Sequence, residues 1–527
     1  MDDFQQIHVD ATEGTLTMFD RIIFRGYLSN LFPDGAFARF LNANGVLLKD
    51  FSGFVQQTTA ELKAHVEQMA ADAERPYEYL ESATTKASGK SKEDLARAIA
   101  ERDHVTEGLI CVFAVVEPCQ SFIVQGNRAA QKLVVTRKRR KCLHFYLYFL
   151  DTELGFMHVR LQSWFPFDLQ VYLNGREWLA QRLSAEGLTG ERYDNTFLHL
   201  QDPAAVQALC DDFAHREWAR VLDAFARKVN PKLALVEQAG FGGYYWTIYQ
   251  AEIATDVMFQ NRASLLSVWP DLRQAALVAF SAEDVLRFLG RKLHGNFKGE
   301  VHSDLKKRPE GWRIKHWMQG NAIKMYDKFS VLRSETTINN AREFKVLKTT
   351  EDTRRWVPMG KGVANFWRYY QVGQQANQRY LGALAHVQLK GEAVAELDGL
   401  CRRRTKDGKH YAKLNPVSAE DCDLFAAVMA GEHTLNGFRN HDLVARLYQT
   451  VANSVAEAKR RCARVSRLTP APTCGVRRCG VAKLRGHGLV AKVKDARLYR
   501  VTERGCRLMS AALAFRREGF PQAAHAA

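Results

Sequence analysis

The sequence predicts an α+β multidomain protein, built from a mixed-sheet body with helices and followed by a separate C-terminal domain. The chain has 527 residues, which is too long for one hydrophobic core. Its hydrophobic content of 46% and aromatic content of 11% are typical of folded protein. Runs of β-branched and aromatic residues alternate with segments of helical periodicity. We therefore expect an N-terminal α+β domain, a central α+β domain, a basic linker and a C-terminal domain, over residues 1–230, 231–391, 392–434 and 435–527.

The net charge limits the classes of partner. The chain carries 75 Lys and Arg against 58 Asp and Glu, which gives a formal charge of +17 and a pI near 9.4. This excess points to a polyanion, most often nucleic acid, although secreted and ribosome-associated proteins share it. Ten cysteines and an acidic start without a secretory signal predict reduced thiols in the cytoplasm. No run of eighteen apolar residues occurs, so no membrane span is expected.

The first predicted strand, residues 14–28, carries an acidic residue between apolar neighbours. The carboxylate of Asp20 on such a strand can hold Mg²⁺ near a phosphate. Alternatively, it pairs with Arg21 or Arg25 and serves only the structure. Periodicity predicts helices at residues 37–48, 54–71, 92–102 and 204–229, and a buried strand at 108–116.

The most concentrated positive charge is the run Arg137, Lys138, Arg139, Arg140 and Lys141. It precedes an aromatic hairpin, which we expect at residues 143–150 and 155–164. The five cations can neutralise backbone phosphates while tyrosines of the hairpin stack on unpaired bases. The alternative is a solvated charge run without a ligand.

Two sets of acidic residues mark the central region. A helix expected to begin near residue 244 bears Glu252 and Asp256, which lie four residues apart and therefore on one helical face. Farther along, carboxylate and imidazole groups alternate onto one face of a predicted strand: Glu300, His302 and Asp304. Such groups at this spacing can ligate Mg²⁺ or Mn²⁺, and polar loop residues are the alternative.

Residues 321–339 predict a β-hairpin around which the central domain is organised. Alternation places three polar side chains of each strand on one face: Lys324, Tyr326 and Lys328, then Arg333, Glu335 and Thr337. If the two faces coincide, the lysines can hold phosphate, Glu335 can ligate a divalent metal, and a tyrosine can attack phosphorus. The candidate nucleophiles are Tyr326 and, from a helix expected at residues 361–384, Tyr370. The alternative is cross-strand ion pairing on a solvated sheet.

The pattern Tyr326-Asp-Lys328 followed by Arg333-Ser-Glu335 resembles a strand pair in the replication initiator proteins of rolling-circle plasmids and filamentous phages. The resemblance covers fewer than twenty residues. It implies a metal-dependent enzyme that nicks DNA with a tyrosine. The paired-histidine motif of many such proteins is absent at His158, which is followed by Val and Arg.

The C-terminal domain has the element order of a winged helix-turn-helix. Helices expected near residues 442–449, 453–465 and 473–485 precede two short strands and a helix capped by Thr502. The string from Lys483 to Val490, followed by Tyr499 to Gly505, resembles the recognition helix and wing of MarR-like regulators. The resemblance implies DNA contacts from Arg477, Arg478, Lys483, Lys492 and Arg497.

These observations favour a nucleic-acid-binding protein over an enzyme of small-molecule metabolism, because the chain has no Walker loop, Gly-rich dinucleotide turn or His-Glu-x-x-His motif. We expect a protein of a mobile or replicating element that acts as a DNA-nicking initiator with Mg²⁺ or Mn²⁺. The alternative is a non-enzymatic binder, either a transcriptional regulator or a structured-RNA-binding protein. The sequence leaves open the choice between DNA and RNA and the oligomeric state.

Overall fold

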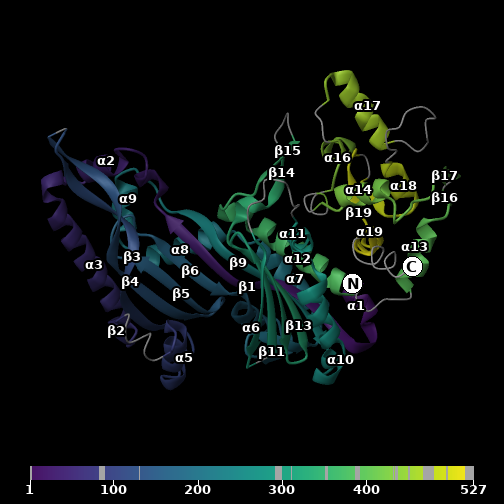
Figure 1. Ribbon diagram of the computed structural model, residues 1–527. Helices are drawn as coiled ribbons and strands as arrows, with labels where there is room; N and C mark the ends of the chain where they lie inside the picture. The colour runs from purple at the N-terminus through teal and green to yellow at the C-terminus, as the bar shows by residue number, and fades with distance from the viewer. Residues whose placement is uncertain are drawn as a thin grey trace.

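One 11-stranded sheet forms the body of the protein and joins its two halves (Figure 1). The computed structural model describes residues 3–516 apart from 82–88, 130, 291–299, 310, 350–353, 386–391, 407, 431–432, 434–436, 449–451, 467–479 and 494–495. Across the sheet, the strands are β10 (His302–Arg308), β11 (Gly311–Met318), β12 (Asn321–Lys328), β13 (Val331–Ile338), β9 (Tyr245–Phe259), β1 (Thr12–Tyr27), β6 (Leu169–Asn174), β5 (Gly155–Gln162), β4 (Lys132–Asp151), β3 (Gly108–Asn127) and β2 (Tyr77–Tyr79). Neighbouring strands are antiparallel except for the parallel β2–β3 pair.

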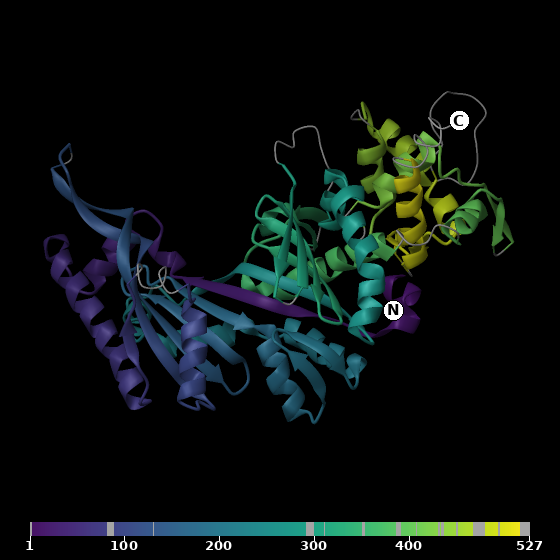
Figure 2. The same cartoon turned by 60° about the horizontal axis from the view of Figure 1, so that its bottom comes forward.

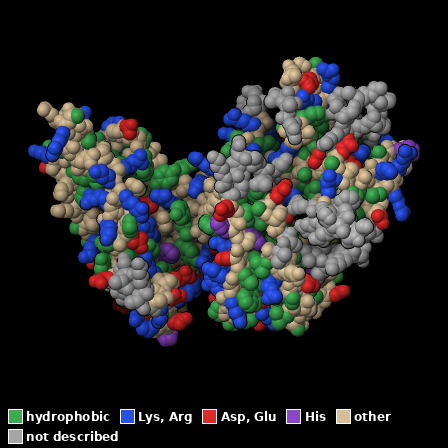
Figure 3. Space-filling view, in the orientation of Figure 1, with side chains coloured by type: hydrophobic (Ala, Val, Ile, Leu, Met, Phe, Trp, Pro, Cys, Tyr) green, Lys and Arg blue, Asp and Glu red, His purple; other side chains and the backbone are tan. Residues whose placement is uncertain are grey.

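The two halves of the sheet open as a V, and β1 runs from one half into the other (Figure 2). The surface is indented between the halves, and Lys and Arg side chains gather on the wall at the right of the indentation (Figure 3). The hairpin of β3 and β4 extends beyond the rest of the sheet (Figure 2). Its two strands pair along their whole length, so the five consecutive cations lie within β4 and not before it.

Helices pack on both halves of this sheet. In the half that contains β9 to β13, α7 contacts β1, and α12 contacts β9 and β13. The helices of the body are α1 (Asp3–Ile7), α2 (Ala36–Ala43), α3 (Phe51–Asp72), α5 (Lys92–Arg102), α6 (Gly175–Ala185), α7 (Pro203–Ala214), α8 (Trp218–Val229), α9 (Leu233–Gln238), α10 (Arg262–Gln274), α11 (Ala282–Phe288) and α12 (Phe366–Ala385). Two small hairpins complete it: β7 (Gly190–Tyr193) with β8 (Thr196–Leu200), and β14 (Lys345–Thr349) with β15 (Arg354–Pro358).

One large hydrophobic core includes residues from Phe4 to Ala385, and a smaller cluster lies between α5 and strands β3 to β5. The boundary predicted at residue 230 falls inside the large core, because β1 from one side of it pairs with β9 from the other. Among the described helices, none has the length and apolar character needed to span a lipid bilayer.

Both predicted hairpins are confirmed. Strands β12 and β13 pair with Lys324 opposite Glu335, and β4 and β5 pair around a turn that follows Asp151. The helix predicted to carry Glu252 and Asp256 is wrong, because that segment is strand β9. Its residues are rich in aromatic and β-branched side chains, which favour strands. A spacing of four residues places two carboxylates on one face of a strand as well as on one face of a helix, so this spacing could not distinguish a helix from a strand.

The C-terminal part has a hydrophobic core of its own. Its elements are α13 (Glu392–Leu400), β16 (Arg404–Lys406), β17 (Lys409–Tyr411), α14 (Ala419–Val428), α16 (Asn440–Leu447), α17 (Val455–Ser466), α18 (Val481–Gly486), β18 (Val490–Lys492), β19 (Tyr499–Val501) and α19 (Glu503–Ala514). The segment predicted as a linker, residues 392–434, contributes Leu400, Leu414 and Phe425 to this core. It therefore packs with the C-terminal helices instead of separating them from the body.

Asn377 on α12 fastens this helix to the sheet. The side chain is fully buried, and its Nδ2 donates to the carbonyl of Ile253 over 2.9 Å. Its Oδ1 accepts from the hydroxyls of Thr336 and Ser334, at 2.8 and 3.2 Å. One amide thus satisfies polar groups of both β9 and β13.

We expect Asn377→Ala to lower the free energy of unfolding by about 2 to 3 kcal/mol, because it leaves several buried polar groups without a partner. Urea denaturation of the purified protein measures this loss. The matched control is Gln378→Ala on the exposed side of the same helix, which should change stability by less than about 0.5 kcal/mol. Equal losses in the two variants would contradict the role assigned to Asn377.

Candidate functional site

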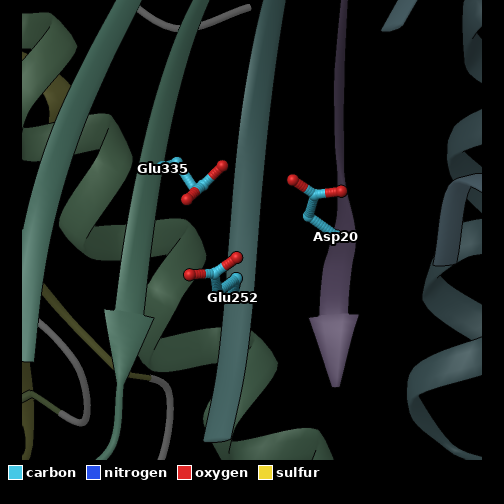
Figure 4. A group of neighbouring side chains, drawn as sticks. All are labelled: Asp20, Glu252 and Glu335. Carbon is cyan, nitrogen blue, oxygen red and sulfur yellow. The ribbon is translucent and has the colours of Figure 1, made fainter. Parts of the chain in front are cut away.

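Three carboxylates from three adjacent strands meet on one face of the central sheet. Asp20 on β1, Glu252 on β9 and Glu335 on β13 each place an oxygen within 4.8 Å of the other two. The three side chains point toward one another (Figure 4). All three residues are buried, with exposed fractions of 3%, 7% and 3%. In the part of the chain that the structure describes, this acidic triad is the single group of three potential metal ligands.

Strand register brings the triad together. An irregularity in β1 places two residues, Asp20 and Arg21, opposite the single residue Glu252 of β9. A bulge of this kind re-aims side chains, here toward the face that carries Glu252. On the other side of β9, Glu335 pairs with Ala254, which lies two residues from Glu252 and therefore on the same face.

A lysine bridges two members of the triad. Nζ of Lys324 lies 2.9 Å from Oε1 of Glu252 and 2.5 Å from Oε1 of Glu335. Burial alone would lower the pKa of Lys324, but the two carboxylates raise it above its usual value. Lys324 is therefore charged at neutral pH and holds the two glutamates side by side.

The third carboxylate is held by a buried arginine and an amide. Asp20 accepts a hydrogen bond from Nδ2 of Asn195 over 2.5 Å, and Nη1 of Arg333 lies 3.5 Å from its other oxygen. Arg333 also binds Asp256 through Nε at 2.7 Å, and Nη1 of Arg176 lies 2.6 Å from the same carboxylate. Burial would raise the pKa of Asp20, but the charges of Arg333 and Arg176 hold it well below the usual range.

Glu335 differs from Asp20 in its protonation. Burial raises the pKa of Glu335 to about 7, and the neighbouring charges of Glu252 and Asp20 act in the same direction, against Lys324 and Arg333. The site thus contains carboxylates of contrasting acidity. Arg21, whose side chain is 56% exposed and lies 4.0 Å from Glu252, marks the side on which the site meets solvent.

The donor set fits a hard divalent cation. Three carboxylates supply only oxygen ligands, which Mg²⁺ and Mn²⁺ prefer. Lys324 shares one oxygen of each glutamate, so an ion held by all three carboxylates would compete with its ammonium group for those oxygens.

The structure confirms that the polar faces of the predicted hairpin coincide. Lys324 lies opposite Glu335, and Tyr326 lies opposite Arg333. The ion pairs predicted as the alternative are present, but they are buried and not solvated. Lys328 is also buried on this face, where burial and the charge of Arg333 lower its pKa against the opposing charges of Asp20 and Asp256. Burial raises the pKa of Tyr326 above its usual value, so its hydroxyl is protonated at neutral pH.

Tyr370, the other candidate nucleophile, lies on the opposite face of the sheet. Its hydroxyl is 2.8 Å from the carbonyl oxygen of Thr17 and 2.9 Å from Oδ1 of Asp211. The residue belongs to α12, which packs against the face that carries Ser334 and Thr336. Tyr370 therefore has a packing role in this structure and does not reach the triad.

The metal ligands predicted from spacing lie apart from the triad. His302 and Asp304 are on β10, the edge strand, and β11 and β12 separate it from β13. Asp304 accepts two hydrogen bonds from Arg313 at 3.0 and 3.1 Å, and His302 lies 3.5 Å from Glu300. His302 and Asp304 share one strand as predicted, whereas Glu300 precedes that strand, and β11 and β12 separate the group from Glu335.

The cation run within β4 is exposed, and none of its members forms an ion pair with a carboxylate of the described residues. The hairpin tyrosines expected to stack on bases are not available. Tyr148 is buried, and the hydroxyl of Tyr146 lies 2.9 Å from both oxygens of Glu117. Glu117 also binds Lys92 at 2.8 Å and Arg160 at 2.9 Å.

The predicted DNA contacts of the C-terminal part are distributed over two elements. Lys483 lies on α18, with its Nζ 3.5 Å from Asp421, and Lys492 and Arg497 are exposed at the β18–β19 hairpin. Arg477 and Arg478 lie outside the described residues.

Two residues of the site, Arg176 and Asn195, carry no signal in the sequence, because neither belongs to a motif or to a periodic pattern.

No protein-family model matches the chain, and neither a curated protein nor a solved structure is similar to it at a significant level. The geometry of the site therefore carries the functional argument.

Glu117 should make the stability of the protein depend on pH. Burial would raise its pKa, but Lys92 and Arg160 lower it to about 2. A carboxylate with a depressed folded-state pKa stabilises the protein above its unfolded pKa, and this stabilisation is lost as the pH falls from about 4.5 to 2. We expect Glu117→Gln to cost about 3 kcal/mol at pH 7 and about 1 kcal/mol at pH 3. Urea denaturation at both pH values measures the difference, and the exposed Glu107→Gln should show none.

Proposed function

We propose that the protein binds nucleic acid and breaks phosphodiester bonds at the acidic triad with the help of Mg²⁺ or Mn²⁺. The observation that carries this proposal is the convergence of three buried carboxylates from β1, β9 and β13 beside lysine and arginine side chains. Buried carboxylates gathered on one sheet face are costly for stability, which favours a functional explanation. The charge of +17 supports a polyanionic substrate.

Each residue then has a distinct role. Asp20, Glu252 and Glu335 hold the metal, which when bound neutralises the phosphate and activates the attacking oxygen. Lys324 and Arg333 position the carboxylates. Exposed Arg21 contacts the phosphate, and Lys328 lies buried on the same face, behind the triad surface that the phosphate would meet.

Tyr326 is the predicted nucleophile that lies on the triad face. Its oxygen would form the new bond to phosphorus while the bond from phosphorus to the leaving sugar oxygen breaks. The phenolic proton passes to a basic group or solvent, and the leaving oxygen takes up a proton. This route gives a nicking reaction with DNA covalently attached to Tyr326, as the resemblance to replication initiators implies.

A second role, recognition of a duplex site without chemistry, follows from the C-terminal part. Support comes from the described helix α18, the β18–β19 hairpin and helix α19 that follow one another there, and from the exposed side chains of Lys492 and Arg497. In a replication initiator or a protein of a mobile element, this part finds the site and the triad cuts there. Without catalysis, the same part supports a transcriptional regulator.

The first test is cleavage of labelled single-stranded and duplex DNA with Mn²⁺. We expect Glu335→Gln to reduce cleavage at least 100-fold and to leave binding in EDTA unchanged. The matched control is Glu300→Gln, which removes an exposed carboxylate of the edge-strand group and should retain full activity. A covalent adduct lost in Tyr326→Phe identifies the nucleophile. Cleavage that is unaffected in Glu335→Gln would contradict the proposal.

Metal binding also has a readout that does not depend on activity. Lys324→Met leaves Glu252 and Glu335 without their shared cation, so we expect it to cost about 3 to 5 kcal/mol of stability. Mn²⁺ should raise the melting temperature of the wild type and should raise that of Lys324→Met by more, because the metal replaces the lost charge. Exposed Lys306→Met is the control and should respond like the wild type. No Mn²⁺-dependent shift in either protein would refute the metal site.

A further inference from the structure

A groove of about 1390 Å³ opens between the start of α2, the β3–β4 hairpin and the ends of β1 and β9, and the three carboxylates of the triad are not in its lining. Its lining combines aromatic rings with cations, including Tyr27, Tyr249, Phe32, Arg25, Arg137 and Arg139. The acidic side chains in the lining are Asp34 and Asp168. Asp168 is already paired with Arg25 at 2.7 Å, so the groove has an excess of positive charge.

Aromatic rings are unusually exposed along this part of the sheet. Tyr245 and Tyr249 on β9 have exposed fractions of 49% and 47%, and Tyr27 on β1 packs edge-on against Tyr245 with ring centroids 5.5 Å apart. Unlike the exposed Tyr79 on β2, Tyr249 lines a groove that also contains cations. An exposed ring of this kind offers a stacking surface to an unpaired base.

Only part of the cation run in β4 faces this groove. Arg137 and Arg139 line it, and the guanidinium of Arg137 lies 4.9 Å from the ring centroid of Phe32. Lys138 and Arg140 alternate with them and point to the other side of the β3–β4 hairpin. Strand β4 therefore offers a matched comparison: Arg137 and Arg139 line the groove, whereas Lys138 and Arg140 carry the same charge but do not line the groove.

The groove is lined by residues of the two strands, β1 and β9, that also carry Asp20 and Glu252. Arg21, Arg25 and Tyr27 follow Asp20 along β1, and Tyr249 precedes Glu252 by three residues on β9. At the rise of a β-strand, that separation is about 10 Å. A strand of nucleic acid seated in the groove thus reaches the carboxylates within one or two nucleotides.

We propose that this groove binds single-stranded nucleic acid, with a base stacked on Tyr249 and phosphates held by Arg137 and Arg139. Tyr245, which is exposed next to Tyr27 but does not line the groove, offers a further stacking surface at its edge. The inference extends the proposed function and rests on it for the direction of the strand toward the triad. A duplex keeps its bases stacked on one another and cannot use the exposed rings. The groove therefore selects unpaired DNA or RNA.

Fluorescence anisotropy with labelled dT12, U12 and a 12-bp duplex, all in EDTA, tests the groove without cleavage. The full chain is used, so the duplex reports binding by the C-terminal part and the groove is tested by the loss of single-strand binding in the variants below. Tyr249→Leu should weaken single-strand binding about tenfold, whereas Tyr249→Phe, which keeps the ring, should bind as the wild type does. Tyr79→Leu, at an exposed tyrosine on the far edge strand β2, is the control.

The charge comparison is the sharper test. Arg137→Ala with Arg139→Ala should weaken single-strand binding at least tenfold and lower its salt dependence. Lys138→Ala with Arg140→Ala removes the same charge from the other side and should change the affinity less than threefold. Equal losses of single-strand affinity in the two double variants, or wild-type affinity in Tyr249→Leu, would refute the proposal that single strands bind in the groove.

These results separate the groove from the proposed chemistry. If the groove variants behave as expected but the wild type cuts no substrate with Mn²⁺, binding of single strands in the groove is supported and the proposed cleavage is refuted. If cleavage needs Glu335 but Tyr249→Leu binds dT12 and U12 normally, the triad stands and the groove fails. Tighter binding of dT12 than of U12 assigns DNA as the ligand, and the reverse assigns RNA.

Discussion

The ion pair between Arg333 and Asp256 is the interaction on which the site depends. Both residues are fully buried, and Arg333 also reaches Asp20 on β1 and the carbonyl of Asn195 beside β8. One guanidinium therefore connects β13, β9, β1 and the β7–β8 hairpin. A guanidinium has a fixed planar set of donors, so these contacts fix the relative positions of the strands as well as neutralising the carboxylates.

The two faces of the central sheet divide structure from function. On the α12 face, Asn377 satisfies small hydroxyl groups, and aromatic rings such as Phe19 and Phe366 stack with centroids 4.2 Å apart. The opposite face carries the charged residues. Because alternate residues of a strand face opposite sides, the same strands can build a stable core and present the triad. The helix face can thus stay apolar without restricting the polar face.

Local pattern predicted much of the fold and only parts of the site. The hairpin of β12 and β13, including the shared face of Lys324 and Glu335, followed from alternation, as did the strand that carries Asp20. The triad did not, because its members are distant in sequence and their meeting depends on which strands are neighbours. The segment that forms β9 was predicted as a helix because Glu252 and Asp256 are four residues apart. That spacing places two side chains on one face of a helix and also on one face of a strand. Burial of the hairpin was missed because the polar pattern is the same for a solvated sheet and for a buried ion network.

Continuity of the sheet connects the triad with the groove in which we propose that nucleic acid binds. The strands β1 and β9 hold the triad near their middles, and their far ends form the floor of the groove with Tyr27 and Tyr249. A rigid sheet keeps the distance between these two sets of residues constant, as catalysis at a defined bond requires. Under the proposal, binding through exposed aromatic rings would contribute affinity away from the carboxylates. The buried network at the triad can remain preorganised before substrate arrives, because recognition does not require those charges to move.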